Sequence, residues 1–178
     1  MQKSSVAGSE RKGVPVVLLG GNHSSEKMRK KEKAVTEQSA IESIIEQSLV
    51  CRLGLIDGEY PYVVPLNFGY KDNTLYFHTG HKGKKVELLR KNRNVCFEFD
   101  SHHEVKTSDN PCKWGMRYRS VVGFGQASFV HDPESKKKAL DIIMAHYGGS
   151  ASRYPEINLD KTLIIRVAIQ AMTGRRSD

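Results

Sequence analysis

The sequence lacks the cysteine patterns that mark disulfide-rich and zinc-binding proteins. It contains only three cysteines, Cys51, Cys96 and Cys112, and no two of them are separated by just two residues. An odd number without that spacing argues against a disulfide framework and against a zinc ribbon. We expect thiols that pack as small apolar side chains in a reducing compartment.

Recognisable metal ligands are also scarce. The side chains that can be combined into a hypothetical site are His78, His81, His102, His103 and Cys112. Their spacing fits no standard set of metal ligands. The sequence therefore predicts no metal centre.

Long hydrophobic runs are missing as well. No apolar run approaches the length of a membrane span. The apolar run at residues 14–19 is too short and badly flanked for a secretory signal. We expect a cytoplasmic protein with no membrane partner.

Basic residues outnumber acidic ones, and the formal net charge is +8. Their densest clusters lie at residues 29–33, 82–91 and 136–138, and no stripe of exposed aromatic residues is interleaved with them, as single-strand binding would favour. An anionic small molecule can use the middle cluster equally well. We therefore expect no nucleic-acid partner.

What is present is typical of one globular domain. The chain has 178 residues, of which 38% are hydrophobic and 27% charged. Residues 1–27 are rich in Ser, Gly and Lys and show no sustained period, so we predict a flexible N-terminal arm. The folded domain is expected over residues 28–178.

The hydrophobic pattern of that domain predicts six strands and three helices. Strands are expected at residues 50–56, 60–70, 75–78, 95–100, 118–130 and 162–169, and helices at 41–49, 83–91 and 133–147. The first helix places Ile41, Ile44, Ile45 and Leu49 on one face. Hairpin signals without regular strand–helix alternation favour a mostly antiparallel barrel with packed helices. Residues 101–117 are expected to form a long, functional loop.

A stretch at residues 62–89 combines an apolar strand pair with a potential anion site. Pro65 within the predicted strand marks an edge, a bulge or a departure from the neighbouring strand. Gly80 and Gly83 permit close backbone approach, and Lys84 and Lys85 add charge at the start of a helix. A cofactor that joins a planar ring to a phosphate needs both surfaces.

Four motifs in this order carry a resemblance to a known family. They are Val-Val-Pro-Leu-Asn-Phe-Gly-Tyr at 63–70, Leu-Tyr-Phe-His-Thr-Gly at 75–80 with Gly-Lys-Lys at 83–85, Val-Cys-Phe-Glu at 95–98, and Trp-Gly-Met-Arg-Tyr-Arg-Ser-Val-Val-Gly-Phe-Gly at 114–125. Together they resemble the pyridoxamine 5′-phosphate oxidase-related FMN-binding proteins, in particular the nitroimidazole-resistance reductase-like branch.

The resemblance implies a split β-barrel that dimerises and binds FMN at the subunit interface. The implied flavin-ring wall consists of Val63, Val64, Pro65, Leu66 and Asn67. His78 and Thr79 lie at a strand end that contacts FMN in the family, and Gly83, Lys84 and Lys85 form the implied phosphate site. Ser120 stands where the oxidases use a glutamine.

Two differences from the oxidases indicate which branch of the family the chain resembles. The region from Arg166 to Arg175 has no match to the substrate residues of the oxidases, which argues against vitamin B6 oxidation. His78 replaces a tyrosine of the oxidases, which favours the nitroimidazole-type branch. At that position His78 can hydrogen-bond the flavin or an acidic substrate, and we expect it to shape the substrate side of the flavin.

Other residues have open alternatives. Trp114 and Tyr118 can stack over the flavin, cover it from a partner subunit, or pack as ordinary core residues. Arg52, within an apolar strand, needs an anionic partner, which is either the phosphate or a carboxylate such as Glu98.

The favoured function is an FMN-dependent oxidoreductase that passes electrons from a reduced nicotinamide to a nitroimidazole or a quinone. Two alternatives remain open. One is a flavin-binding module for sensing or storage with little turnover, and the other is the same barrel holding haem or a deazaflavin.

Overall fold

The computed structural model describes residues 31–150 and 153–178, so the arm predicted at residues 1–27 lies outside the described part. The strands are β1 (Ala34–Val35), β2 (Cys51–Asp57), β3 (Tyr60–Leu66), β4 (Gly69–Lys71), β5 (Thr74–Thr79), β6 (Asn94–Lys106), β7 (Gly115–Val130) and β8 (Leu163–Ser177). The helices are α1 (Gln38–Gln47), α2 (Lys84–Lys91), α3 (Pro133–His146) and α4 (Glu156–Lys161), and 3-10 turns occur at Lys31–Lys33 and Pro111–Lys113.

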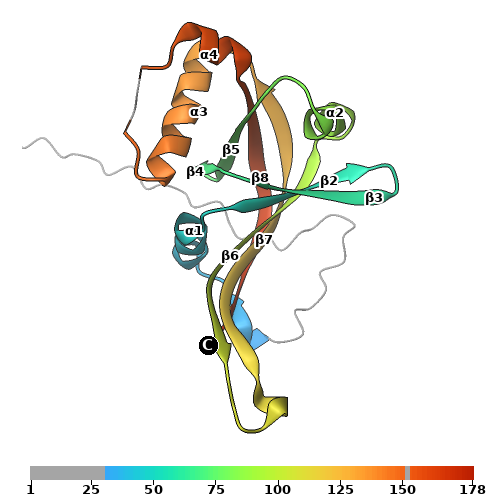
Figure 1. The fold of residues 1–178 in the computed structure, drawn as a ribbon, viewed down its shortest axis with the longest axis vertical. Helices are drawn as coiled ribbons and strands as arrows, with labels where there is room; N and C mark the ends of the chain where they lie inside the picture. The colour runs from blue at the N-terminus through green and yellow to red at the C-terminus, as the bar shows by residue number, and fades with distance from the viewer. Residues whose placement is uncertain (1–30, 151–152) are drawn as a thin grey trace, which may run out of the picture.

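The strands form one antiparallel sheet in the order β3-β2-β6-β7-β8-β5-β4, and the short β1 pairs with β8. The sheet is curved but not closed, since β3 and β4 end the path as unpaired edges (Figure 1). This is the split barrel that the resemblance implied. All six predicted strands are present, although the one predicted at 60–70 is divided into β3 and β4.

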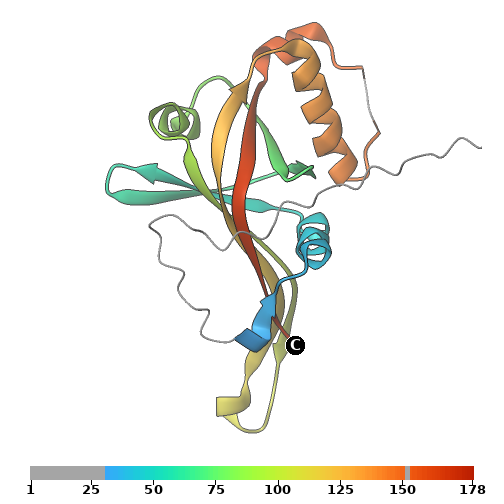
Figure 2. The same cartoon turned by 180° about the vertical axis from the view of Figure 1, so that it is seen from behind.

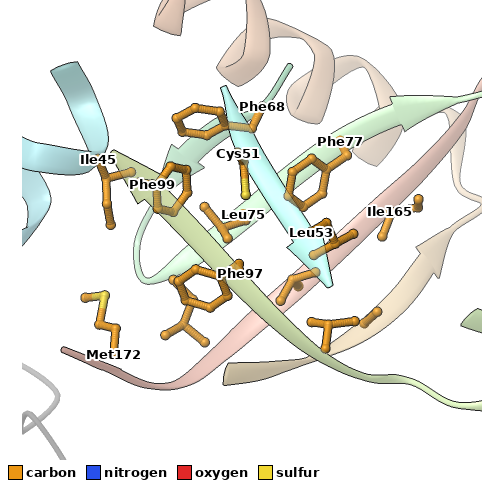
Figure 3. Packing of buried hydrophobic residues seen from close by; sticks show 14 of the residues in the cluster. Ile45, Cys51, Leu53, Phe68, Leu75, Phe77, Phe97, Phe99, Ile165 and Met172 are labelled. Atoms are coloured by element: carbon orange, nitrogen blue, oxygen red, sulfur yellow. The ribbon is translucent and has the colours of Figure 1, made fainter. Parts of the chain in front are cut away.

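The inner face of the sheet encloses the core. Phe97 and Phe99 on β6 pack with Leu53 on β2 and Phe77 on β5, and all four side chains are fully buried (Figure 3). Helices α1 and α2 add further apolar side chains to the same cluster. Each fully buried side chain of this size stabilises the fold by about 1.5–3 kcal/mol.

The outer face of the sheet is only partly covered. Helix α3 packs over β4 and β5, where Gly69 leaves room for the backbone of the helix. Over β2, β3, β6 and β7 no described helix covers the outer face. Large apolar side chains are exposed there, namely Ile56 (52%), Val63 (58%), Val122 (39%) and Phe124 (39%).

The prediction of a long loop at residues 101–117 was wrong. Strands β6 and β7 continue through most of this stretch as a two-stranded arm that projects beyond the barrel (Figures 1 and 2). The register shifts between Ser101 and Glu104, and His102 there adopts a positive φ of 57°. The hydrophobic pattern missed the arm because most of its side chains are exposed rather than alternating between core and solvent, while its backbone groups are still paired.

The helices differ from prediction at their ends. Ile41, Ile44 and Ile45 of α1 are buried as predicted, but Leu49 is exposed because the helix ends at Gln47. The short helix α4 was not predicted. None of the helices in the described part is long and apolar enough to cross a membrane.

Candidate functional site

The free edge of β3 forms one wall of the candidate site. Asp57 and Tyr60 pair beside a two-residue turn, so Tyr60, Val64 and the other even-numbered residues of β3 exchange hydrogen bonds with β2. Pro61 and Pro65 therefore point their nitrogens away from β2, where no donor is required. Between them, Val63 directs its N–H outward. The edge predicted from Pro65 is confirmed.

The five predicted ring-wall residues do not share one face. Val64 and Leu66 pack inward against the core cluster. Val63, Pro65 and Asn67 are exposed on the opposite side. Only these three can present side chains to a ligand outside the barrel, and Val64 and Leu66 can contribute only backbone groups.

The start of α2 forms the second wall. Gly83 is the N-cap residue with φ 119° and makes no side-chain cap hydrogen bond. A Cβ at this position would have no neighbour within 4 Å, so the backbone is open to approach. The first N–H groups of a helix lack intrahelical acceptors and attract anions.

Lys84 connects the two walls. Its Nζ lies 2.5 Å from Oδ2 of Asp57 and 5.0 Å from the centroid of the Tyr62 ring. The hydrogen bond to Asp57 raises the pKa of Lys84 above its ordinary value. The helix start is therefore held against the turn end of the β2–β3 hairpin, and the ammonium remains charged.

Lys85 differs from its neighbour. Its side chain is partly buried, and that burial lowers the pKa of Lys85 below its usual range. No carboxylate in the described part of the chain forms an ion pair with it. A partly desolvated ammonium without a partner favours an anionic ligand.

His78 and Thr79 end β5, the strand that precedes this loop. They pair with Ile164 and Leu163 of β8. His78 is exposed, on the face of β5 opposite the buried Phe77. His78 therefore lies near the start of the Gly/Lys loop and is accessible to a ligand.

Ser120 and Trp114 lie elsewhere in the same chain. Ser120 pairs with Asp100 of β6, and two residues before Asp100 the same strand pairs with Arg52 of β2. Asp57, which holds the start of α2, lies five residues further along β2, so about seven residues, or about 23 Å, separate it from Ser120 along the sheet. Trp114 is 55% exposed near the tip of the arm, and its Nε1 donates to the carbonyl of Ser108. Neither residue reaches the α2 loop of its own chain.

Sequence reasoning missed Asp57 and Tyr62 as parts of the site. In the sequence, Asp57 and Gly58 form the turn signal between the strands predicted at 50–56 and 60–70. An acidic residue in a hairpin turn gives no local signal of a cation that follows much later in the chain.

Arg52 has carboxylate partners. Its guanidinium lies 3.0 Å from Glu98 and 2.5 Å from Asp100 on the outer face of the sheet. His103 also contacts Asp100, at 2.9 Å. Of the two alternatives for Arg52, the structure favours the carboxylate, and the arginine is not available to the α2 loop.

Other features of the described chain lie apart from this site. The residues that the structure places contain no group of three or more His, Cys, Asp or Glu side chains that could hold a metal ion. A cleft of about 820 Å³ lies between α3 and the β4–β5 hairpin, but none of the predicted site residues lines it. We therefore assign the candidate site to β3, β5 and α2.

Comparison with known proteins gives one family match. The family model described as pyridoxamine 5′-phosphate oxidase matches residues 37–176. No curated protein matches the chain.

Solved structures share the fold. A candidate 5-nitroimidazole antibiotic resistance protein from Bacteroides thetaiotaomicron has 38% identity and a TM-score of 0.72, with 82% of this chain and 90% of that chain covered. An FAD- and haem-binding protein from Mycobacterium smegmatis has 18% identity and a TM-score of 0.73, with 82% and 74% covered. An F420 reductase has 24% identity and a TM-score of 0.51, with 78% and 98% covered.

Proposed function

Because the chain belongs to the pyridoxamine 5′-phosphate oxidase family, we propose that it is an FMN-dependent oxidoreductase. In this proposal a reduced nicotinamide donates the electrons, and a small acceptor such as a nitroimidazole or a quinone receives them. The solved structure with 38% identity, a candidate 5-nitroimidazole antibiotic resistance protein, supports this acceptor class.

The observation that carries the proposal is the position of α2 against the β2–β3 hairpin. It places a helix start beside the free edge of β3, with a partly buried Lys85 that forms no ion pair with a described carboxylate. The exposed Gly83 backbone and the helix dipole suit a phosphate, and the outward N–H of Val63 suits a polar edge of a flavin ring. The residues present therefore fit FMN.

The flavin, when bound, supplies the hydride and electron chemistry. The chain's own residues bind and orient it. Lys85 and the first N–H groups of α2 hold the phosphate, and Val63 and Pro65 form the ring wall. His78, exposed at the end of β5, contacts the flavin or the acceptor and shapes the substrate side, without an obligatory proton transfer.

A second copy of the chain completes the site in this proposal. The uncovered outer face carries exposed Ile56, Val63 and Val122, which is typical of a surface that a partner covers. Ser120 lies on the same face of β7 as Val122, and Trp114 directly precedes this strand near the tip of the arm; both lie too far from their own α2 loop to serve it. They therefore act on the flavin of the partner subunit.

The first test is the absorption spectrum of the full chain, purified and then reconstituted with FMN. We expect the two visible bands of an oxidised flavin, bleaching by NADH or NADPH without oxygen, and recovery when a 5-nitroimidazole or a quinone is added. Bands of haem, or binding of F420 in place of FMN, would replace the cofactor assignment. A yellow protein that neither nicotinamide reduces would favour a sensing or storage module.

Variants of α2 test the phosphate site. Lys85→Met should weaken FMN binding about tenfold or more and leave riboflavin, which has no phosphate, unaffected. The matched control is Lys91→Met at the other end of the same helix, which should bind FMN like the wild type. Equal losses for both variants would contradict the assignment.

His78→Ala tests the substrate side separately. We expect altered reduction rates that depend on the acceptor, with FMN retained. Unchanged FMN affinity together with unchanged rates for every acceptor would remove His78 from the site.

A further inference from the structure

We propose that Asp57 competes with the cofactor's phosphate for the ammonium of Lys84, and thereby sets the preference of the site for phosphorylated over unphosphorylated flavins. The inference rests on the proposed function. It concerns an acidic residue that neither the sequence motifs nor the comparisons with known proteins connect to the site.

The contacts of Lys84 are the starting point. Its Nζ lies 2.5 Å from Oδ2 of Asp57 and above the ring of Tyr62, at 5.0 Å from the centroid. The lysine at the first position of α2 is therefore already neutralised by a carboxylate of the same chain. An arriving phosphate meets a paired ammonium at this position.

Lys85, the next residue, provides the contrast within the same helix turn. It is partly buried, and it has no ion pair with any described carboxylate. The two adjacent lysines thus differ in burial and in ion pairing. Lys85 is available to a phosphate at once, whereas Lys84 becomes available only when Asp57 releases it.

The pair can exchange partners because both side chains are accessible. The Lys84 side chain is 53% exposed and that of Asp57 is 38% exposed. Ion pairs at such positions contribute little to stability and are screened by salt. A phosphate with up to two negative charges can therefore compete for Lys84, while the carboxylate of Asp57 repels it.

The charge of Asp57 then lowers the affinity for FMN and does not change the affinity for riboflavin. Asp57→Asn keeps the shape of the side chain, removes the repulsion and frees Lys84. We expect FMN to bind about two- to fivefold tighter to this variant. Riboflavin should bind with unchanged affinity, so the ratio of the two dissociation constants is the measurement.

Lys84 provides the second half of a double-mutant cycle. In the wild type, Lys84→Met removes an ammonium that Asp57 already holds and leaves the Asp57 carboxylate unpaired, so FMN binding should weaken moderately. In the Asp57→Asn background the same substitution should cost more, because Lys84 is free to bind the phosphate. This coupling identifies competition for one ammonium.

The control variant is Asp72→Asn. It removes the same charge from the β4–β5 turn, at the opposite edge of the sheet, and should leave the FMN-to-riboflavin ratio at the wild-type value. Raising the salt to about 1 M should shrink the effect of Asp57→Asn, since the screening length falls to about 3 Å.

Each outcome has a distinct meaning. If Asp57→Asn weakens FMN and riboflavin equally, Asp57 only holds α2 in place and the competition proposal is wrong. If it changes neither, or if Asp72→Asn has the same effect, the proposal is also wrong. If the wild type binds no FMN at all, the proposed function fails instead.

Discussion

The ring of Phe97 fills the space that a side chain on Gly123 would require. A Cβ built on Gly123 would lie 2.6 Å from Cε2 of Phe97 and 2.7 Å from the carbonyl oxygen of Ala171. This close approach lets β7 lie directly against the aromatic centre of the barrel.

Gly123→Ala should therefore destabilise the protein. Inserting a methyl group into a packed core typically costs about 1–3 kcal/mol, and we expect a loss of that size in the free energy of unfolding measured with denaturant. Gly115→Ala, in the same strand, is the control, because a Cβ there meets nothing within 4 Å. Similar effects of both substitutions would show that packing on Phe97 is not the cause.

Tyr147 offers a second stability test. Its hydroxyl accepts from the N–H of Phe68 at 3.1 Å and donates to the carbonyl of Leu49 at 2.8 Å. Tyr147→Phe removes both hydrogen bonds and should lower the free energy of unfolding by about 1 kcal/mol. Tyr60→Phe should have no effect, since Tyr60 is 75% exposed.

The N-cap of α3 should make part of the stability depend on pH. Asp132 accepts from the N–H of Ser135 at 2.8 Å, and that backbone hydrogen bond lowers the pKa of Asp132. A lowered pKa in the folded state means that the contribution exists above the ordinary aspartate range and is lost as the pH falls through the lowered value.

Asp132→Ala should thus lower the melting temperature at pH 7 by about 2–4 °C. The difference from the wild type should shrink in strong acid, where Asp132 is protonated and caps only as a neutral group. Asp132→Asn keeps a capping side chain and should stay closer to the wild type at pH 7. A difference between Asp132→Ala and the wild type that is constant at every pH would exclude the ionised cap.

The uncovered outer face predicts the oligomeric state. Val122→Asp places a charge in this face and should convert the proposed dimer to a monomer in sedimentation equilibrium. Met144→Asp, on the exposed side of α3, should remain dimeric.

The fluorescence of the single tryptophan, Trp114, reports the same change if the arm reaches the partner. Its emission should then shift to longer wavelength in the monomer. A monomeric wild type would contradict the proposed dimer.

The sequence predicted the strands whose side chains alternate between core and solvent. The alternation at residues 95–100 reflects the burial of Phe97 and Phe99, and this burial is a local property of the pattern. The arm beyond Ser101 was missed because its pairing depends on backbone groups, which every residue type supplies.

The candidate site could be predicted only in part for a similar reason. The Gly/Lys loop at the start of α2 was recognised from neighbouring residues. The contact of Lys84 with Asp57 depends on how the chain folds back, and no local pattern encodes it. The motif at residues 114–125 assigned Ser120 and Trp114 to the flavin site by resemblance. It could not show how far these two residues lie from α2 of their own chain.

The pairing of β8 has a consequence for the order of folding during synthesis. This strand lies between β7 and β5, so without it the sheet consists of two separate pieces, β3-β2-β6-β7 and β5-β4. The first piece carries the proline-marked edge of β3, and the second leads into the Gly/Lys loop. Because β8 follows all other strands in the sequence, a ribosome must complete the domain before the two halves of the site can meet. A nascent chain should therefore acquire flavin only after β8 has been translated.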